Sequence, residues 1–76
     1  MIKEQVGRRI REIRLSKGLS QEKSALNANI DRTYWASVEL GKRNISIINL
    51  EKICNSFEIS LSDFFNSDVF TRGINE

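Results

Sequence analysis

The feature that most constrains this chain is the helical spacing of its apolar residues, which is broken at short intervals by residues that end helices. Val6, Ile10 and Ile13 fall at positions i, i+4 and i+7, so they share one face of a helix. The chain contains no proline, and strand-like alternation of apolar and polar residues is hard to find. The pattern therefore predicts an all-α fold built from several short helices.

Capping and turn residues place the boundaries of five predicted helices. Side chains that can accept a hydrogen bond from a first-turn amide stand at four places: Ser20, Asp31, Ser46, and Ser60 with Asp63. Gly18 and Gly41 can end helices, and Asn29 tolerates the left-handed conformation of a sharp turn. The predicted helices are residues 3–16, 21–27, 32–39, a fourth that begins after Ser46, and 61–65. We expect one domain over residues 1–70 and a frayed tail over residues 71–76.

The small size of the chain calls for stabilisation from outside its own core. A chain of 76 residues buries only about 60% of its unfolded surface. Its single cysteine, Cys54, cannot form an internal disulfide, and the lack of histidine argues against a zinc site. A partner subunit is the remaining means. We therefore expect a homodimer, with no cofactor, metal or small-molecule ligand.

Charge is distributed unevenly along the chain. Residues 1–52 hold eleven Lys/Arg and six Asp/Glu, a net charge of +5, whereas residues 53–76 have a net charge of −3. A basic part of this kind suits a surface that faces phosphate. No apolar run is long enough to span a bilayer, and the N-terminus lacks the apolar stretch of a signal peptide. We expect a cytoplasmic protein with no membrane partner.

The predicted helices 21–27 and 32–39 are joined by a turn of about four residues, which is the arrangement of a helix-turn-helix unit. The chain resembles the phage-repressor and Cro type of helix-turn-helix domain over about residues 3–66. The residues that carry the resemblance are Leu19-Ser20-Gln21-Glu22, Ala25, Ala28, Ile30, Asp31-Arg32-Thr33-Tyr34, Val38-Glu39, Gly41-Lys42-Arg43-Asn44, Ser46-Ile47, Leu50, Ile53 and Ile59-Ser60-Leu61-Ser62-Asp63-Phe64-Phe65. Within this family, the chain looks most like the controller proteins of restriction–modification systems.

The resemblance implies a five-helix, lambda-repressor-like bundle that binds a palindromic operator in duplex DNA as a two-fold dimer. Its third helix would enter the major groove, as in other motifs of this type. Controller proteins regulate their own gene and the endonuclease gene, so that cleavage begins after methylation. This role is implied by the resemblance alone.

Three residues at the helix starts are candidate DNA contacts. Gln21 stands at the first turn of its helix, where free amides favour a phosphate. Arg32 can bond two acceptors on a guanine edge, and Thr33 offers a hydroxyl and a methyl to a base. The alternatives are a surface glutamine, and an Arg32 that pairs with Asp31 or Glu39.

Four more candidate contacts lie further along the predicted recognition helix or follow it. The Tyr34 ring either packs beneath the helix or faces DNA, as an aromatic residue does in related proteins. Ser37 lies one turn on and is short enough to reach a base or phosphate. Arg43 and Asn44 form a polar loop that either stays solvated or follows the DNA backbone.

Structural roles are expected for four residues. Glu39 is acidic where a DNA-facing charge should be basic, so we expect it to accept bonds within the bundle, with Arg14 as one candidate partner. Trp35 and Ser24 depart from the family pattern, which has an aliphatic residue at each place, and we expect the indole to fill the volume a leucine would hold. The Cys54 thiol is expected to be buried and inert.

The late apolar residues exceed what one small core obviously buries, which favours a dimer interface. The candidate interface residues are Ile48, Phe64, Val69 and Phe70. The alternative is that Phe64 or its neighbour Phe65 closes the bundle of its own protomer.

Other functions remain as alternatives. No nucleophile–base pair or phosphate-binding glycine loop supports an enzyme. An antitoxin or a phage-type repressor would keep the fold and bind a protein partner through the C-terminal apolar surface. A protein-interaction module without DNA binding is disfavoured by the basic region that contains Arg32 and Arg43.

Overall fold

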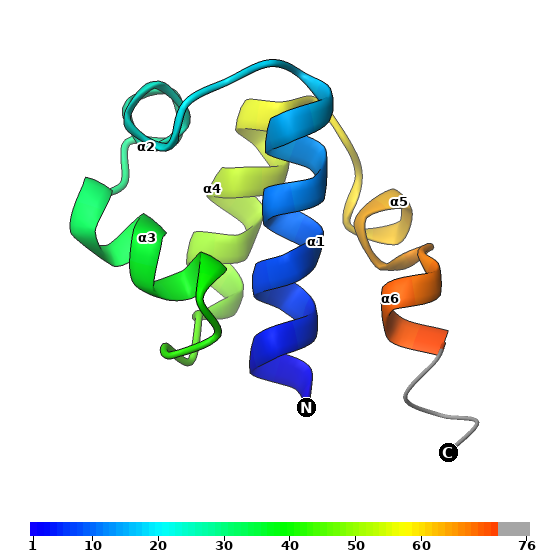
Figure 1. The fold of residues 1–76 in the computed structure, drawn as a ribbon. Coiled ribbons are helices and arrows are strands. Elements are labelled where there is room, and N and C mark those ends of the chain that lie inside the picture. Colours follow the sequence, from blue (N-terminus) through cyan, green and yellow to red (C-terminus); the bar gives the residue numbers. More distant parts are fainter. Residues whose placement is uncertain (72–76) are drawn as a thin grey trace.

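The structure, a computed structural model, describes residues 1–71 and contains no strand in that range. Its helices are α1 (Ile2–Ser16), α2 (Gln21–Ala28), α3 (Arg32–Glu39), α4 (Ile47–Phe57), α5 (Leu61–Phe65) and α6 (Asp68–Thr71). In Figure 1, α1 runs through the middle of the molecule with α4 behind it, α2 and α3 on one side, and α5 and α6 on the other. The predicted all-α bundle is confirmed.

Side-chain caps begin four of the helices, as the sequence predicted. The oxygens of Ser20, Asp31, Ser46 and Ser60 accept hydrogen bonds from the backbone amides of Lys23, Tyr34, Asn49 and Asp63, at 2.9–3.0 Å. Each bond satisfies an amide that has no partner inside its helix. The caps fix the starts of α2 to α5 within a residue of the predicted positions.

Two non-glycine residues adopt the left-handed conformation between helices. Asn29 has φ 57° and turns the chain from α2 into α3, as expected. Glu58 has φ 60° and ends α4, a position that the sequence did not reveal because glutamate is not typical of such turns. The residues after both turns, Ile30 and Ile59, pack against the core.

The core lies where α1 and α4 meet the shorter helices. Ile10 and Ile53 are fully buried, as are the rings of Trp35, Phe57 and Phe64. The Trp35 and Phe57 rings meet edge to face with centroids 5.9 Å apart, a favourable aromatic geometry. Cys54 is also buried, and burial raises the pKa of its thiol despite the nearby charge of Arg9. The expected buried thiol is confirmed.

α1 and the end of α3 pack backbone against backbone. Gly7 is buried there, and a Cβ at this position would overlap the backbone oxygens of Val38 and Glu39. Glycine is therefore required because the two helices meet backbone against backbone. This contact fixes the position of α3 relative to α1.

The C-terminal part differs from the prediction. A sixth helix, α6, follows the five predicted ones, and Thr71 belongs to it rather than to a frayed tail. Gln5 of α1 donates a hydrogen bond to the Val69 carbonyl oxygen at 3.1 Å, which helps to hold this short helix. Residues 72–76 of the expected tail lie outside the described residues. None of the described helices combines the length and apolarity needed to cross a membrane.

Candidate nucleic-acid interface

The first turn of α3 presents the two residues with the strongest predicted base contacts. Arg32 and Thr33 are both exposed, directly after the Asp31 cap. None of the ion pairs formed within residues 1–71 includes Arg32. The alternative in which Arg32 pairs with Asp31 or Glu39 is therefore not observed, and its guanidinium remains available to a ligand.

Glu39, at the other end of α3, is the centre of a buried polar network. Its carboxylate accepts two hydrogen bonds from Arg14, at 2.6 and 3.0 Å, and one from the Trp35 indole at 2.6 Å. Burial alone would raise the pKa of Glu39, but the bonds from Arg14, Gln21 and Trp35 and the Arg14 charge outweigh it and lower the pKa. The predicted structural role of Glu39 and its pairing with Arg14 are confirmed.

Gln21 joins this network through its side chain. Its Nε2 donates to a Glu39 carboxylate oxygen at 3.0 Å, and the residue is half-buried. The network therefore ties the start of α2 to the end of α3 and to α1. The predicted phosphate contact of Gln21 stays a prediction, with the side chain held at the start of α2.

Trp35 fills the corner of the helix-turn-helix unit. It is 1% exposed, as is Ser24 on α2, so the expected burial of the indole is confirmed. The Ser24 hydroxyl has no hydrogen-bond partner within the described residues. The burial of Trp35 and Ser24 does not test whether the indole fills the volume that a leucine would hold, so this exchange stays a prediction.

The Tyr34 side chain makes contacts within the protomer. Its hydroxyl accepts a hydrogen bond from the Asn49 side chain at 3.3 Å, and the guanidinium of Arg43 lies over its ring, 5.2 Å from the centroid. Tyr34 is half-buried, as is Ser37. The arrangement links α3, the following loop and α4, so Tyr34 serves the bundle while its hydroxyl hydrogen remains free to donate.

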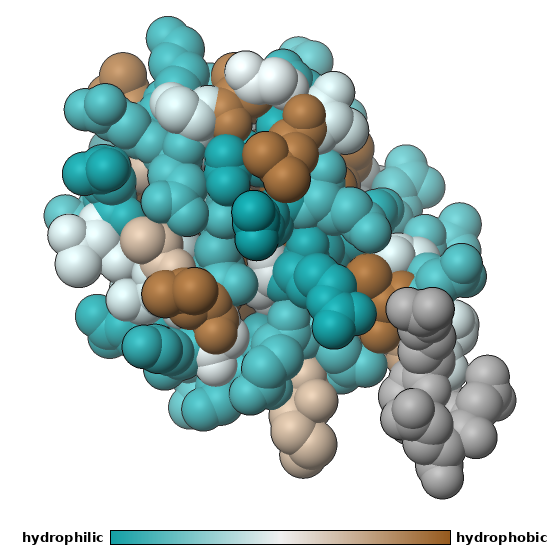
Figure 2. Space-filling view, viewed as in Figure 1, coloured by the Kyte–Doolittle hydropathy of each residue, from teal (hydrophilic) through white to brown (hydrophobic). Residues whose placement is uncertain are grey.

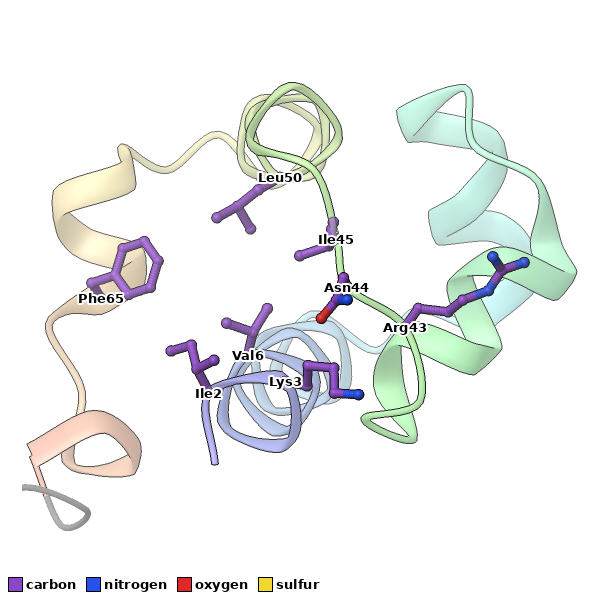
Figure 3. Close-up of a pocket in the computed structure, with 8 residues that line it drawn as sticks. All are labelled: Ile2, Lys3, Val6, Arg43, Asn44, Ile45, Leu50 and Phe65. Carbon is purple, nitrogen blue, oxygen red and sulfur yellow. The ribbon is translucent and has the colours of Figure 1, made fainter.

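The loop after α3 borders an apolar groove of about 200 Å³. Figure 3 shows Ile2 and Val6 of α1, Ile45, Leu50 and Phe65 around this groove, with the Arg43 guanidinium pointing away from it. Arg43 and Asn44 are both exposed. The Arg43 guanidinium lies on the outer side of the loop, whereas the Asn44 side chain is directed toward the groove.

The predicted interface residues separate into two groups. Phe64 is fully buried and Val69 is 7% exposed, because both side chains pack inside the protomer. Neither offers free surface to a partner, so placing them in a dimer interface was wrong on this point. Ile48 is exposed and Phe70 half-buried, and these two stay predictions. Leu61 and Phe65, two others of the late apolar residues, are also exposed, as is Ile47, which the sequence did not single out for an interface.

The face of the molecule seen in Figure 2 is mostly hydrophilic, with separate apolar patches.

The sequence did not predict the long-range hydrogen bonds made by two polar side chains, those of Asn49 and Arg9. Asn49 follows the Ser46 cap by three residues, a spacing that accounts only for its backbone amide. Its side-chain bond to Tyr34 joins residues 15 positions apart, and no local pattern reveals such a bond.

Comparisons with known proteins agree with this geometry. Residues 7–67 match the helix-turn-helix domain family. The control protein C.MunI of a Mycoplasma species is 46% identical over 66 residues, which cover 86% of this chain and 89% of the relative.

Two solved structures are similar in three dimensions. The controller protein C.AhdI of Aeromonas hydrophila has a TM-score of 0.79 and 40% identity, covering 82% of this chain and 94% of the other. The C.Esp1396I tetramer in complex with its natural 35 base-pair operator has a TM-score of 0.85 and 36% identity, covering 100% of this chain and 97% of the other. With its capped recognition helix and these matches over most of its length, the chain belongs to the helix-turn-helix family of restriction–modification controller proteins.

Proposed function

We propose that this protein is a sequence-specific transcriptional regulator that binds a palindromic operator as a homodimer. Its target would be the promoters of a restriction–modification system, its own promoter among them. The observation that carries the proposal is the free pair Arg32 and Thr33 at the capped start of α3. The operator complex of C.Esp1396I supports it, because that relative matches this chain over its full length.

The chemistry of the surface fits base and phosphate recognition. Arg32 can donate two bonds to a guanine edge, and Thr33 can contact a thymine methyl or a base acceptor. Because the Tyr34 hydroxyl already accepts a bond from Asn49, it is left to donate to an acceptor such as a phosphate oxygen. Arg43, Asn44, Ser37 and the first turn of α2 at Gln21 would then contact the backbone or a base edge.

The remaining parts of the proposal follow from the same regulator family. Residues 1–71 would act as one DNA-binding domain, in the cytoplasm where the promoters lie, and without catalysis. The dimer would form through apolar side chains of the C-terminal half, with the exposed Ile48 of α4 and the half-buried Phe70 of α6 as the candidates retained from the sequence. The two recognition helices would then meet successive turns of the major groove.

Footprinting of the upstream DNA of its own gene tests this function. We expect protection of inverted half-sites whose centres lie about one helical turn apart. Arg32→Ala should weaken binding by about 10- to 100-fold, as expected for loss of a bidentate base contact. Lys52→Ala removes an exposed cation from α4 and is the matched control, with a change of about twofold or less.

Salt dependence separates this function from binding to a protein partner. Release of several counterions should give a steep fall of affinity with salt concentration. Equal binding of wild type and Arg32→Ala, or the absence of any salt-dependent DNA complex, would contradict the proposal and favour a protein partner.

A further inference from the structure

Tyr34 is held on several sides within the protomer. Its backbone amide donates to the Asp31 cap at 3.0 Å, and its half-buried ring packs against the core. The Arg43 guanidinium lies over the ring, 5.2 Å from the centroid, within the range of a cation–π contact. The ring therefore has a fixed place, and the direction of its hydroxyl hydrogen is what stays adjustable.

Asn49 is fixed on α4 in the same way. Its backbone amide donates to the Ser46 cap at 3.0 Å, so Asn49 is the third residue of α4, as Tyr34 is of α3. The Asn49 side chain is half-buried, and its Nδ2 donates to the Tyr34 hydroxyl oxygen at 3.3 Å. Two capped helix starts therefore bring one amide donor to one phenol.

The direction of this bond decides what the Tyr34 hydroxyl can offer to a ligand. A phenol can both donate and accept, whereas the NH2 group of an amide only donates. A Tyr34 hydrogen aimed at Nδ2 would meet another hydrogen, so it must point away from Asn49. The free side of the hydroxyl is then a donor. It suits an acceptor on DNA, which is a phosphate oxygen or an acceptor of a base edge.

We propose that Asn49 is a positioning residue for DNA recognition, which acts by fixing the Tyr34 hydroxyl as a donor toward an acceptor on the operator. The inference rests on the DNA binding of the proposed function. A phosphate oxygen is the acceptor that the surroundings favour, because the positive charge of Arg43 lies against the same ring. Asn49 itself contacts no DNA in this account.

Asn49→Asp inverts the bond with little change of shape. A carboxylate only accepts, so it would take the Tyr34 hydrogen and leave DNA facing an oxygen without a hydrogen. The first turn of a helix tolerates aspartate because the helix dipole favours a negative charge there. Asn49→Ala removes the donor without adding a charge. Asn55→Ala, at an exposed position of the same helix, is the matched control.

Raman spectroscopy of the protein without DNA tests the direction of the hydrogen bond. Tyr34 is the single tyrosine of the chain, so the intensity ratio of the tyrosine ring doublet reports whether this one hydroxyl accepts or donates. We expect Asn49→Asp to shift the ratio toward that of a donor, and Asn55→Ala to leave it unchanged. An unchanged ratio in Asn49→Asp would overturn the inference.

A double-mutant cycle of operator affinity tests whether Asn49 acts through Tyr34. We expect Tyr34→Phe to weaken binding by about tenfold and Asn49→Ala by about three- to tenfold, because a bond to a charged acceptor is lost or misdirected. In the Tyr34→Phe background, Asn49→Ala should change the affinity by about twofold or less. Asn49→Asp should keep only the repulsion of its charge in that background, and should weaken binding further when the Tyr34 hydroxyl is present.

Operators with single base changes distinguish the two kinds of acceptor. If the acceptor is a phosphate oxygen, Tyr34→Phe weakens the binding of every operator by the same factor. If it is a base edge, Tyr34→Phe relaxes the preference at one base pair. Either result supports the role of Asn49 when the cycle shows coupling between the two residues.

The outcomes separate this inference from the proposed function. Equal losses from Asn49→Ala with and without the Tyr34 hydroxyl overturn it, because Asn49 would then act on DNA directly or through the fold. Wild-type affinity of Tyr34→Phe, with weakened binding by Arg32→Ala, overturns this inference alone. A wild-type protein that binds no operator overturns the proposed function, and the inference with it. Circular dichroism establishes that each variant is folded, and if Asn49→Ala does not fold, Asn49→Asp carries the cycle.

Discussion

The two sides of α1 hold their neighbours by different means. On the side of α3, Gly7 brings two backbones together, and Arg14 enters the buried network of Glu39, Gln21 and Trp35. On the side of α5 and α6, the polar side chains of Gln5 and Arg9 bond to backbone carbonyl groups of very short helices. On the α3 side the two backbones meet directly beside a buried polar network, whereas on the α5 and α6 side the buried side chains of Phe64 and Val69 are supplemented by separate polar bonds.

This difference suits the separate tasks of a dimeric DNA-binding protein. A recognition helix must present Arg32 and Thr33 in one geometry, and its tight contact with α1 allows little movement. α5 is anchored by one buried ring, that of Phe64, and its other attachments are separate side-chain bonds to backbone carbonyl groups. We therefore expect substitutions on the α3 side to unfold the protein, and those on the α5 side to act locally.

Trp35→Ala should have the largest effect and would break the α3 side of the comparison. Removal of a fully buried indole costs about 4 kcal/mol, and Glu39 loses one of its donors. Since the whole free energy of unfolding of such a domain is roughly 5–10 kcal/mol, most of the fold is at risk. Urea denaturation followed by circular dichroism measures the loss.

Trp35→Phe is the matched control for this variant. It keeps an aromatic ring but removes the indole N–H, so it should cost about 1–2 kcal/mol. A Trp35→Ala protein as stable as wild type would show that the corner of the helix-turn-helix unit does not depend on this side chain.

Glu39→Gln should cost about 3 kcal/mol at neutral pH, because it leaves the buried Arg14 without its charge partner. The pKa of Glu39 is lowered in the folded state. Its stabilisation is therefore complete at pH values above the ordinary glutamate pKa of 4.5 and is lost as the pH falls through the lowered folded value. Denaturation of both proteins across this range should show their difference shrinking toward acid pH. A constant difference would contradict a charged Glu39.

Gly7→Ala should destabilise the protein by about 2 kcal/mol. The new methyl group meets the carbonyl oxygens of Val38 and Glu39, so α1 and α3 must separate. The gain in helix propensity, about 1 kcal/mol, offsets part of this cost. Thermal melting measures the effect, and operator affinity measured on the folded protein reports whether α3 has moved. An unchanged melting temperature would mean that the contact is less rigid than its geometry indicates.

The parts of the fold that the sequence predicted are those governed by neighbouring residues. Ser20, Asp31 and Ser46 cap helices because each acts within its own first turn, and Asn29 turns the chain through its own conformation. The exposure of Arg32 follows in the same way from its place after the Asp31 cap. The pairing of Arg14 with Glu39 was also accessible, because an acid in a basic, DNA-facing helix requires a partner.

What the sequence did not reveal depends on contacts between distant residues. A helix of five residues has too little periodicity to show whether Phe64 or Phe65 faces inward, and the core decides this. α6 is shorter still and is held by Gln5, 64 residues away from Val69. The bonds from Gln21 to Glu39 and from Asn49 to Tyr34 likewise form only after the helices have packed.

Gln5→Ala should have the smallest effect and would sharpen the comparison most directly. It removes one partly buried hydrogen bond to the Val69 carbonyl oxygen, worth about 1 kcal/mol. Because the bond holds only α6, the loss should appear as faster hydrogen exchange of the amides of α6, with those of α3 unchanged. Lys3→Ala, an exposed substitution two residues away on α1, is the control and should alter neither. If exchange in α3 rose together with exchange in α6, the two sides of α1 would open as one unit, and the distinction between them would have no consequence for the dynamics of the protein.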